Sequence, residues 1–172
     1  AWGSLGAREM NKKIAQFMRC ECEDGTPFHH IHATGSFGWR WMPDYVREQG
    51  VDLAAQSRIE MREYIYDMPQ VLAAADLIIC RAGAATIAEV CASGTPCIMV
   101  PSPNVTGNHQ EKNARVLERS GAAAVVREAD CDGKSLYETA KSILSDAGRM
   151  RAMRASARDM AVVDAAERIY QT

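Results

Sequence analysis

The chain contains 172 residues, 47% hydrophobic and 24% charged, and 20 basic against 22 acidic residues give a formal net charge of −2. This composition fits one globular domain and argues against a general nucleic-acid-binding protein, which normally has a basic excess. No apolar run approaches the roughly 18 residues that suggest a membrane span, and the first residues do not resemble a secretory signal.

Strand-like and helix-like segments alternate along the chain. The first glycine turn leads into a helix whose apolar residues recur at helical spacing: Met10, Ile14, Phe17 and Met18. Further strands are predicted over residues 27–35, 57–65, 76–80, 96–100 and 122–126, and further helices over 42–50, 67–75, 85–93, 109–121 and the remaining C-terminal residues. This alternation predicts a Rossmann-like, doubly wound parallel sheet with helices on both faces, in a single α/β domain that spans residues 1–172.

The glycine turn at residues 3–6 has the form of a link between a strand and its helix, yet only two residues precede it. A doubly wound sheet normally places its first strand at the centre. We therefore expect the chain to begin just after a strand that the complete domain contains.

The start of the helix predicted over residues 109–121 has a capping signal. Asn108 and Glu111 have the spacing of a capping box, in which each side chain bonds a free backbone N–H group. Gly121 is predicted to end this helix.

The six cysteines do not form a recognisable disulfide framework. Cys80 and Cys97 lie within apolar strand-like runs, where a reduced cysteine behaves as a small hydrophobic residue. Cys20 and Cys22 are too close in sequence for an ordinary bridge. The pattern indicates a reducing, cytoplasmic compartment.

Three other groups of residues favour a structural interpretation. His30 and His32 share one face of a predicted strand, but no Cys/His pair follows at zinc-finger spacing, so we assign no metal. Trp39 and Trp41 could stack on a base, although packing or a partner surface is favoured. Residues 150–170 are predicted to form an amphipathic helix packed on the sheet, with a membrane-surface helix as the alternative.

Three segments join a strand to a helix through small residues, at positions 3–6, 81–86 and 106–110. In parallel sheets the carboxyl ends of the strands meet at one edge, where the following helices present unpaired N–H groups and a partial positive charge. Small residues let a ligand approach the backbone closely. Each segment alone is more often structural, but together they predict a site for a nucleotide or a sugar phosphate.

Glu89 lies in the helix that follows the second segment. An acid near a helix start gains roughly 0.3–1 kcal/mol from the helix dipole and needs no ligand. In the other interpretation, its carboxylate accepts hydrogen bonds from both ribose hydroxyls, as an acid does in dinucleotide-binding folds. The residue pattern leaves both interpretations open.

A resemblance to a known family covers essentially the whole chain. The segments ADLIICRAGAATIAEVCASGTPCIMVPSP and NHQEKNARVLERSGAA closely resemble the C-terminal, donor-binding half of the MurG family, as do GSLGAR, HATG, YIYDM and DAAERI. This family transfers N-acetylglucosamine (GlcNAc) from UDP-GlcNAc to undecaprenyl-pyrophosphoryl-MurNAc-pentapeptide in peptidoglycan synthesis. Its fold is GT-B, with two Rossmann-like domains, of which the second binds most of the nucleotide sugar.

The resemblance implies a role for individual residues in binding the nucleotide. It implies that Ser4 contacts the diphosphate, and that Ile65 offers backbone groups to the uracil with Met68 close by. The phosphates and the nucleoside are expected to meet backbone and side-chain groups of Ala84, Ala85 and Thr86.

The resemblance also assigns residues to the two sugars. It implies that Glu89 binds the ribose hydroxyls. His109 and Gln110 align with a pair of which Gln110 is expected to contact the GlcNAc hydroxyls. Arg81 belongs to the motif, but the resemblance assigns it no contact.

The chain departs from the family in two ways. Ala1 and Trp2 stand where members have a further glycine and a strand. The N-terminal domain, which in the family holds the acceptor-lipid site, the membrane-facing patch and the proposed base, is expected to be absent, so no catalytic residue is assigned to this chain.

The expected chemistry is an inverting displacement in which a helix N-terminus stabilises the departing UDP. None of the three loops contains an Asp-x-Asp pair, so we expect no metal and no cofactor. The expected partners are UDP-GlcNAc and, through the absent half, the lipid-linked acceptor at the inner face of the plasma membrane; no nucleic acid is expected. The alternatives are the donor subunit of a two-chain GlcNAc transferase and a sugar-nucleotide-binding module without catalysis.

Overall fold

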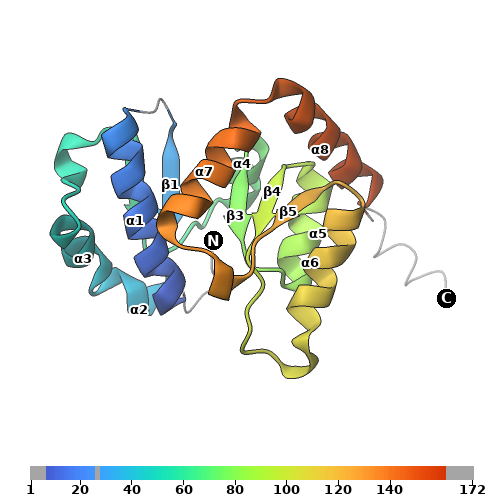
Figure 1. Cartoon of the computed structure of the whole chain (residues 1–172), viewed down its shortest axis with the longest axis horizontal. Helices are drawn as coiled ribbons and strands as arrows, with labels where there is room; N and C mark the ends of the chain where they lie inside the picture. The colour runs from blue at the N-terminus through green and yellow to red at the C-terminus, as the bar shows by residue number, and fades with distance from the viewer. Residues whose placement is uncertain (1–6, 26–27, 162–172) are drawn as a thin grey trace. The chain divides into compact units, whose positions relative to one another are not determined.

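The computed structural model describes residues 7–25 and 28–161 (Figure 1). They belong to two compact units: one contains the residues up to Asp67 together with Val126–Ser142, and the other contains Met68–Val125 and the residues from Ile143 onward. Ser4 and the segment DAAERI lie outside the described residues. Within the described ranges, no helix is both long enough and apolar enough to span a bilayer.

The first unit contains a two-stranded parallel sheet. Strand β1 (His30–Ala33) pairs with β2 (Ile59–Arg62), with His30 opposite Ile59 and Ala33 opposite Arg62. The helical elements of this unit are α1 (Arg8–Asp24), α2 (Ser36–Trp39), α3 (Met42–Glu48), the 3-10 turns η1 (Leu53–Ala55) and η3 (Glu128–Asp130), and α7 (Gly133–Leu144).

Helix α1 packs its apolar side into the core of the first unit. The four residues that recur at helical spacing are all buried: Met10, Ile14, Phe17 and Met18. The ring of Phe17 meets the rings of His30 and Tyr137 edge to face, at centroid distances of 5.4 and 5.3 Å. The helix ends at Gly25, whose φ of 58° is a left-handed conformation that favours glycine. The helix is therefore specified by both its apolar spacing and its terminal residue.

The second unit contains a three-stranded parallel sheet, in the order β3-β4-β5. Strand β4 (Cys97–Met99) lies between β3 (Ile78–Cys80) and β5 (Ala123–Val125), and all of its residues are buried, as expected for a central parallel strand with both faces covered. The helices of this unit are α4 (Met68–Ala74), α5 (Ala84–Ser93), α6 (His109–Arg119), which follows the 3-10 turn η2 (Thr106–Asn108), and α8 (Ala147–Asp159).

The predicted parallel α/β class is confirmed, and each predicted strand contains a strand of the structure. The described strands form two sheets rather than one continuous sheet.

Helix α8 confirms the predicted amphipathic helix over its described part. Met150, Met153 and Ala157 are buried, and Ala157 belongs to the core cluster that includes residues of β3, β4 and β5. The side chain of Arg158 lies over Gly94, where a Cβ atom would approach its Nε to 2.6 Å. Glycine at position 94 thus allows the arginine stem to cover the end of α5.

The histidines of β1 have structural partners, as predicted. His32 is 3% exposed, and its Nε2 lies 3.1 Å from Asn11 Oδ1. Since Asn11 Nδ2 donates to the Thr34 carbonyl at 2.8 Å, its Oδ1 must accept, so His32 carries its proton on Nε2. Burial lowers the pKa of His32 well below its usual value. His30 Nδ1 lies 2.7 Å from Glu21 Oε2.

The six cysteines are free thiols, in agreement with the sequence. Burial raises the pKa of Cys80 to about 11. This thiol therefore behaves as a small core residue.

The two described tryptophans differ in their surroundings. Trp39 is 42% exposed. The ring of Trp41 packs against Tyr45, with ring centroids 5.6 Å apart, and lies under the Arg8 guanidinium at 5.3 Å.

Candidate functional site

Helix α5 begins at the carboxyl end of β3 without a side-chain cap. Gly83 occupies its N-cap in an extended conformation and offers no side chain to the first N–H groups of the helix. A Cβ atom built on Gly83 would meet no atom of the described residues within 4 Å. Ala84 and Ala85, the first two helical residues, are exposed. The helix start is therefore open to an anionic group from outside the unit.

Glu89 lies on the exposed side of the same helix. Residues four apart share a helix face, so Glu89 lies above Ala85, and both are exposed. Val90 and Cys91 are buried and anchor the opposite side in the core. This arrangement places backbone N–H groups and a carboxylate on one accessible surface.

Helix α6 begins at the carboxyl end of the neighbouring strand β4. Gly107 has a φ of 63°, and a Cβ there would have no neighbour within 4 Å in the part of the chain that the structure describes. His109 Nδ1 lies 2.9 Å from the Thr106 carbonyl oxygen, which can only accept, so Nδ1 is the donor. The other ring nitrogen, Nε2, takes no part in this bond. His109 is exposed, and its ring is oriented by its own loop.

The side chain of Gln110 is held in one orientation by the segment after β4. The backbone N–H of Ser102 donates to Gln110 Oε1 at 2.9 Å. Because a backbone N–H can only donate, the atom facing it must be the amide oxygen, which leaves Nε2 as the outer, donating end. Gln110 is half-buried, and this end suits an acceptor oxygen such as a sugar hydroxyl.

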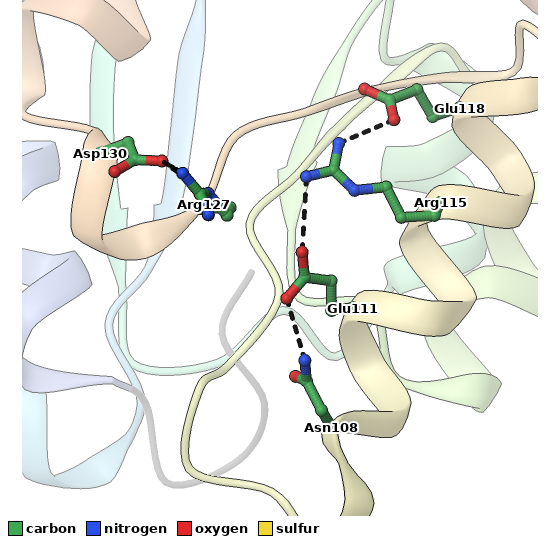
Figure 2. A network of polar contacts seen from close by, with 6 residues as sticks. All are labelled: Asn108, Glu111, Arg115, Glu118, Arg127 and Asp130. Atoms are coloured by element: carbon green, nitrogen blue, oxygen red, sulfur yellow. Dashed lines mark hydrogen bonds and ion pairs between the residues drawn. The ribbon is translucent and has the colours of Figure 1, made fainter.

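The predicted capping box at Asn108 is wrong. Asn108 is the residue before α6, but its backbone is left-handed, with φ 51°, and its side chain makes no capping bond. Its Nδ2 instead donates to Glu111 Oε2 at 3.0 Å. Glu111 forms an ion pair with Arg115, which also pairs with Glu118 one turn further along the helix (Figure 2). The left-handed backbone turns the amide toward the helix surface, and the N–H groups of the first turn stay uncapped. Gly121, with φ 80°, follows the end of α6 as predicted.

The five described helices of ten residues or more fall into two groups. Helices α1, α5 and α6, which follow the three segments predicted to face phosphates, have no side-chain cap. Helix α7 is capped by Asp132, whose Oδ1 accepts from the N–H of Ser135 at 2.7 Å, and α8 is capped by Asp146, which accepts from Arg149 at 2.9 Å. The absence of caps therefore coincides with the predicted ligand segments.

The remaining predicted residues lie elsewhere in the chain. In the first unit, Ile65 is half-buried between Tyr64 and Tyr66, whose rings are 5.9 Å apart. Met68 is half-buried at the first residue of α4 in the second unit. The first unit also has a cavity of about 240 Å³ at the first turn of α1, lined by Ala7, Arg8, Asn11, Phe37, Gly38 and Trp41.

The sequence did not reveal the contacts of three residues that fasten the edge of the second sheet. Arg81 Nη1 donates to the Val100 carbonyl at 3.0 Å, Asn113 Nδ2 donates to the Ala82 carbonyl at 3.4 Å, and Ser102 holds Gln110. One signal was available for Asn113. It follows Gln110 by three positions, so the two amides share a face of α6.

The fold and the site together define a parallel α/β protein that presents uncapped helix N-termini at the carboxyl edge of its sheet, a class suited to phosphorylated ligands. Residues 2–169 match the family model described as the glycosyltransferase family 28 C-terminal domain. The chain belongs to this family.

Two relatives have the name UDP-N-acetylglucosamine–N-acetylmuramyl-(pentapeptide) pyrophosphoryl-undecaprenol N-acetylglucosamine transferase. The chain is 38% identical to that of Acetivibrio thermocellus over 98% of its own length and 44% of the relative. It is 39% identical to that of Listeria welshimeri, over 98% and 45% of the two lengths. The chain thus spans less than half the length of these relatives.

Solved structures agree with the family. The crystal structure of MurG from Acinetobacter baumannii is 27% identical and superposes with a TM-score of 0.80 over 98% of this chain and 46% of that one. The calicheamicin glycosyltransferase CalG4 superposes with a TM-score of 0.68, covering 99% of this chain and 41% of CalG4 at 20% identity, and supports the fold alone.

Proposed function

We propose that this chain binds UDP-GlcNAc and is the donor half of an inverting transferase that delivers GlcNAc to undecaprenyl-pyrophosphoryl-MurNAc-pentapeptide. The names of the relatives from Acetivibrio thermocellus and Listeria welshimeri support this donor and this acceptor. The observation that carries the proposal is the pair of uncapped helix starts at neighbouring strands, with Glu89 exposed on one helix and Gln110 oriented on the other.

In this proposal the diphosphate lies at the starts of α5 and α6, where helix dipoles and N–H groups compensate its charge. Ala84, Ala85 and Thr86 provide the N–H groups of α5, and Ser4 is assigned to the diphosphate as well. The charge on the diphosphate grows as the bond to the sugar breaks, so the same N–H groups stabilise the departing UDP.

The other contacts recognise the nucleoside and the sugar. Glu89 accepts hydrogen bonds from the ribose hydroxyls, and Ile65 offers backbone groups to the uracil, with Met68 nearby. Gln110 donates from Nε2 to a GlcNAc hydroxyl, with His109 beside it. The 4-hydroxyl of the acceptor attacks the anomeric carbon, and the base that takes its proton is assigned to a domain outside this chain.

The complete enzyme is proposed to act at the inner face of the plasma membrane, because its acceptor is lipid-linked. The residues of this chain provide donor binding, so the chain alone is expected to transfer no GlcNAc to a lipid I analogue. Turnover by the purified chain would contradict the assignment of the base to another domain.

Two variants test the assigned contacts by calorimetry with UDP, UDP-GlcNAc and UDP-glucose. Glu89→Ala removes the ribose acceptor and is expected to weaken all three ligands about tenfold, the effect of losing hydrogen bonds to a charged group. Gln110→Ala is expected to weaken UDP-GlcNAc and to leave UDP unchanged. Asp159→Ala removes an exposed acid from the end of α8 and is the matched control. If Glu89→Ala and Gln110→Ala both bind like the parent chain, the proposed site is wrong.

A further inference from the structure

The strands β3 and β4 separate beyond their last residues, and this leaves buried carbonyl groups to be satisfied. The ladder continues for one bond past β4, where the Val100 N–H donates to the Cys80 carbonyl at 2.8 Å. After that point the chain of β3 turns into α5 and the chain of β4 enters the loop to α6. Ala82 and Val100 are both fully buried, so their carbonyls need partners from the protein.

Two side chains supply those partners. Arg81 Nη1 donates to the Val100 carbonyl at 3.0 Å, which ties the loop after β3 to the segment after β4. Asn113 Nδ2, from the first turns of α6, donates to the Ala82 carbonyl at 3.4 Å. Both side chains are half-buried. The Arg81 bond joins the loop after β3 to the segment after β4, and the Asn113 bond joins the loop after β3 to α6.

These bonds bear on the proposed donor site because they hold its backbone. Ala82 immediately precedes Gly83, the N-cap of α5, so its position determines where the first N–H groups of α5 point. Val100 is two residues before Ser102, which orients Gln110. A ligand that spans both helix starts needs them at a fixed separation, and prior ordering of the two loops lowers the entropic cost of binding.

We propose that Arg81 and Asn113 are positioning residues: they lock the loop after β3 to the segment after β4 and to α6, and they set the affinity for the uridine nucleotide without touching it. This inference rests on the proposed function for its ligand, but the lock itself can be observed without a ligand. Arg81 thereby gains a role, although it carries the charge expected of a phosphate contact.

The test compares Arg81→Met, Asn113→Ala and Asn113→Asp with Thr95→Val. Thr95 Oγ1 donates to the Leu72 carbonyl at 2.9 Å and is 1% exposed, so Thr95→Val removes a bond of the same kind before the start of β4, at the opposite end of that strand. It controls for a general loss of stability. Asn113→Asp replaces the donor with a carboxylate that faces a carbonyl oxygen, so its effect is expected to exceed that of Asn113→Ala.

Amide hydrogen exchange is measured first, without ligand. The lock predicts that the hydrogen-bonded amides of Ile87, Val100 and Ser102 exchange about tenfold faster in the Arg81 and Asn113 variants, with the rest of the second unit unchanged. No such local change is expected in Thr95→Val. Exchange at the parental rate at those three amides would overturn the proposal, whether or not the chain binds a nucleotide.

Affinities for UDP and uridine are then measured by NMR titration. The lock predicts a loss of about tenfold for both ligands in Arg81→Met, because the loop and not a phosphate contact is changed. A loss for UDP alone would assign Arg81 to the phosphates and overturn its positioning role, as would unchanged affinity in a variant with faster exchange. If the parent chain binds neither ligand, the proposed function fails, and the exchange rates alone decide whether the lock exists.

Discussion

The helix starts of this protein follow two designs that use the same backbone groups differently. Helices α7 and α8 begin at Asp132 and Asp146, whose carboxylates accept from their own first turns. Helices α5 and α6 begin at Gly83 and Asn108, which provide no cap. A capped start contributes about 1 kcal/mol to stability, whereas an uncapped start keeps its N–H groups for a ligand.

The space around the first residues also differs between a capped and an uncapped helix. Gly133, the first residue of α7, has the Lys13 carbonyl oxygen 2.3 Å from the position of an added Cβ. Among residues 7–25 and 28–161, no atom lies within 4 Å of the same position at Gly83. Glycine therefore serves internal packing at one helix start and leaves open space at the other.

The largest predicted effect comes from Gly133→Ala. The new methyl group would overlap the backbone of α1, and backbone cannot move aside as a flexible side chain can. We expect a loss of about 3 kcal/mol in the free energy of unfolding, measured by urea denaturation. A stability equal to that of the parent chain would show that α7 does not pack on α1 as described.

The second effect is a loss of stability in acid that depends on His32. Its pKa in the folded protein lies well below its value of about 6.5 in the unfolded chain, so below pH 6.5 the unfolded state binds one more proton. This contribution is fully present above pH 6.5 and falls by about 1.4 kcal/mol per pH unit as the pH decreases toward the folded pKa.

The measurement is the unfolding free energy of the parent chain and of His32→Gln between pH 7.5 and pH 5. The neutral amide cannot titrate, so the variant is expected to lack this part of the pH dependence, whatever its stability at pH 7.5. Parallel curves for the two proteins would contradict the assignment of His32 as a buried neutral donor to Asn11.

The third prediction concerns Gly83→Ala, the counterpart of Gly133→Ala. Its φ of −73° suits alanine, and the methyl group would enter open space, so stability is expected to change by less than about 0.5 kcal/mol. Binding of UDP is expected to weaken about tenfold, because the methyl group occupies the approach to the helix start. A calorimetric affinity equal to that of the parent chain would place the ligand elsewhere.

The smallest effect is expected from the cap of α8. Asp146→Ala should cost about 1 kcal/mol of stability and leave UDP affinity unchanged, since this cap only satisfies its own helix. Asp146→Asn retains an acceptor oxygen and is the matched control. A change in UDP affinity without a change in stability would contradict the claim that the capped start of α8 takes no part in ligand binding.

The sequence predicted most of the elements because their signals are local. The apolar spacing from Met10 to Met18 identified α1, and glycine after a helical run identified the end of α6. The uncapped start of α6 could not be predicted, since Asn108 and Glu111 have the spacing of a capping box whether or not the backbone turns left-handed. That conformation depends on the path of the whole loop from β4.

The contacts at the site show a similar limit. Residue type and spacing identified Glu89 and Gln110 as candidate ligand contacts. The bonds from Arg81 to Val100 and from Ser102 to Gln110 instead join residues that no helical or strand spacing relates. The Arg81 bond forms where β3 and β4 separate, and the distance between two strands cannot be read from one sequence. The side chains that hold the site in place were therefore harder to predict from the sequence than the side chains that face the ligand.

The central claim is that the uncapped helix starts receive the diphosphate. A ¹⁵N-labelled sample titrated with UDP and observed by amide NMR tests it most directly. We expect the largest shifts at the N–H groups of Ala84, Ala85, Thr86 and Gln110, and no shift at Ser135 and Arg149 in the capped turns of α7 and α8. Shifts confined to the capped helices, or no shifts with millimolar UDP, would contradict it.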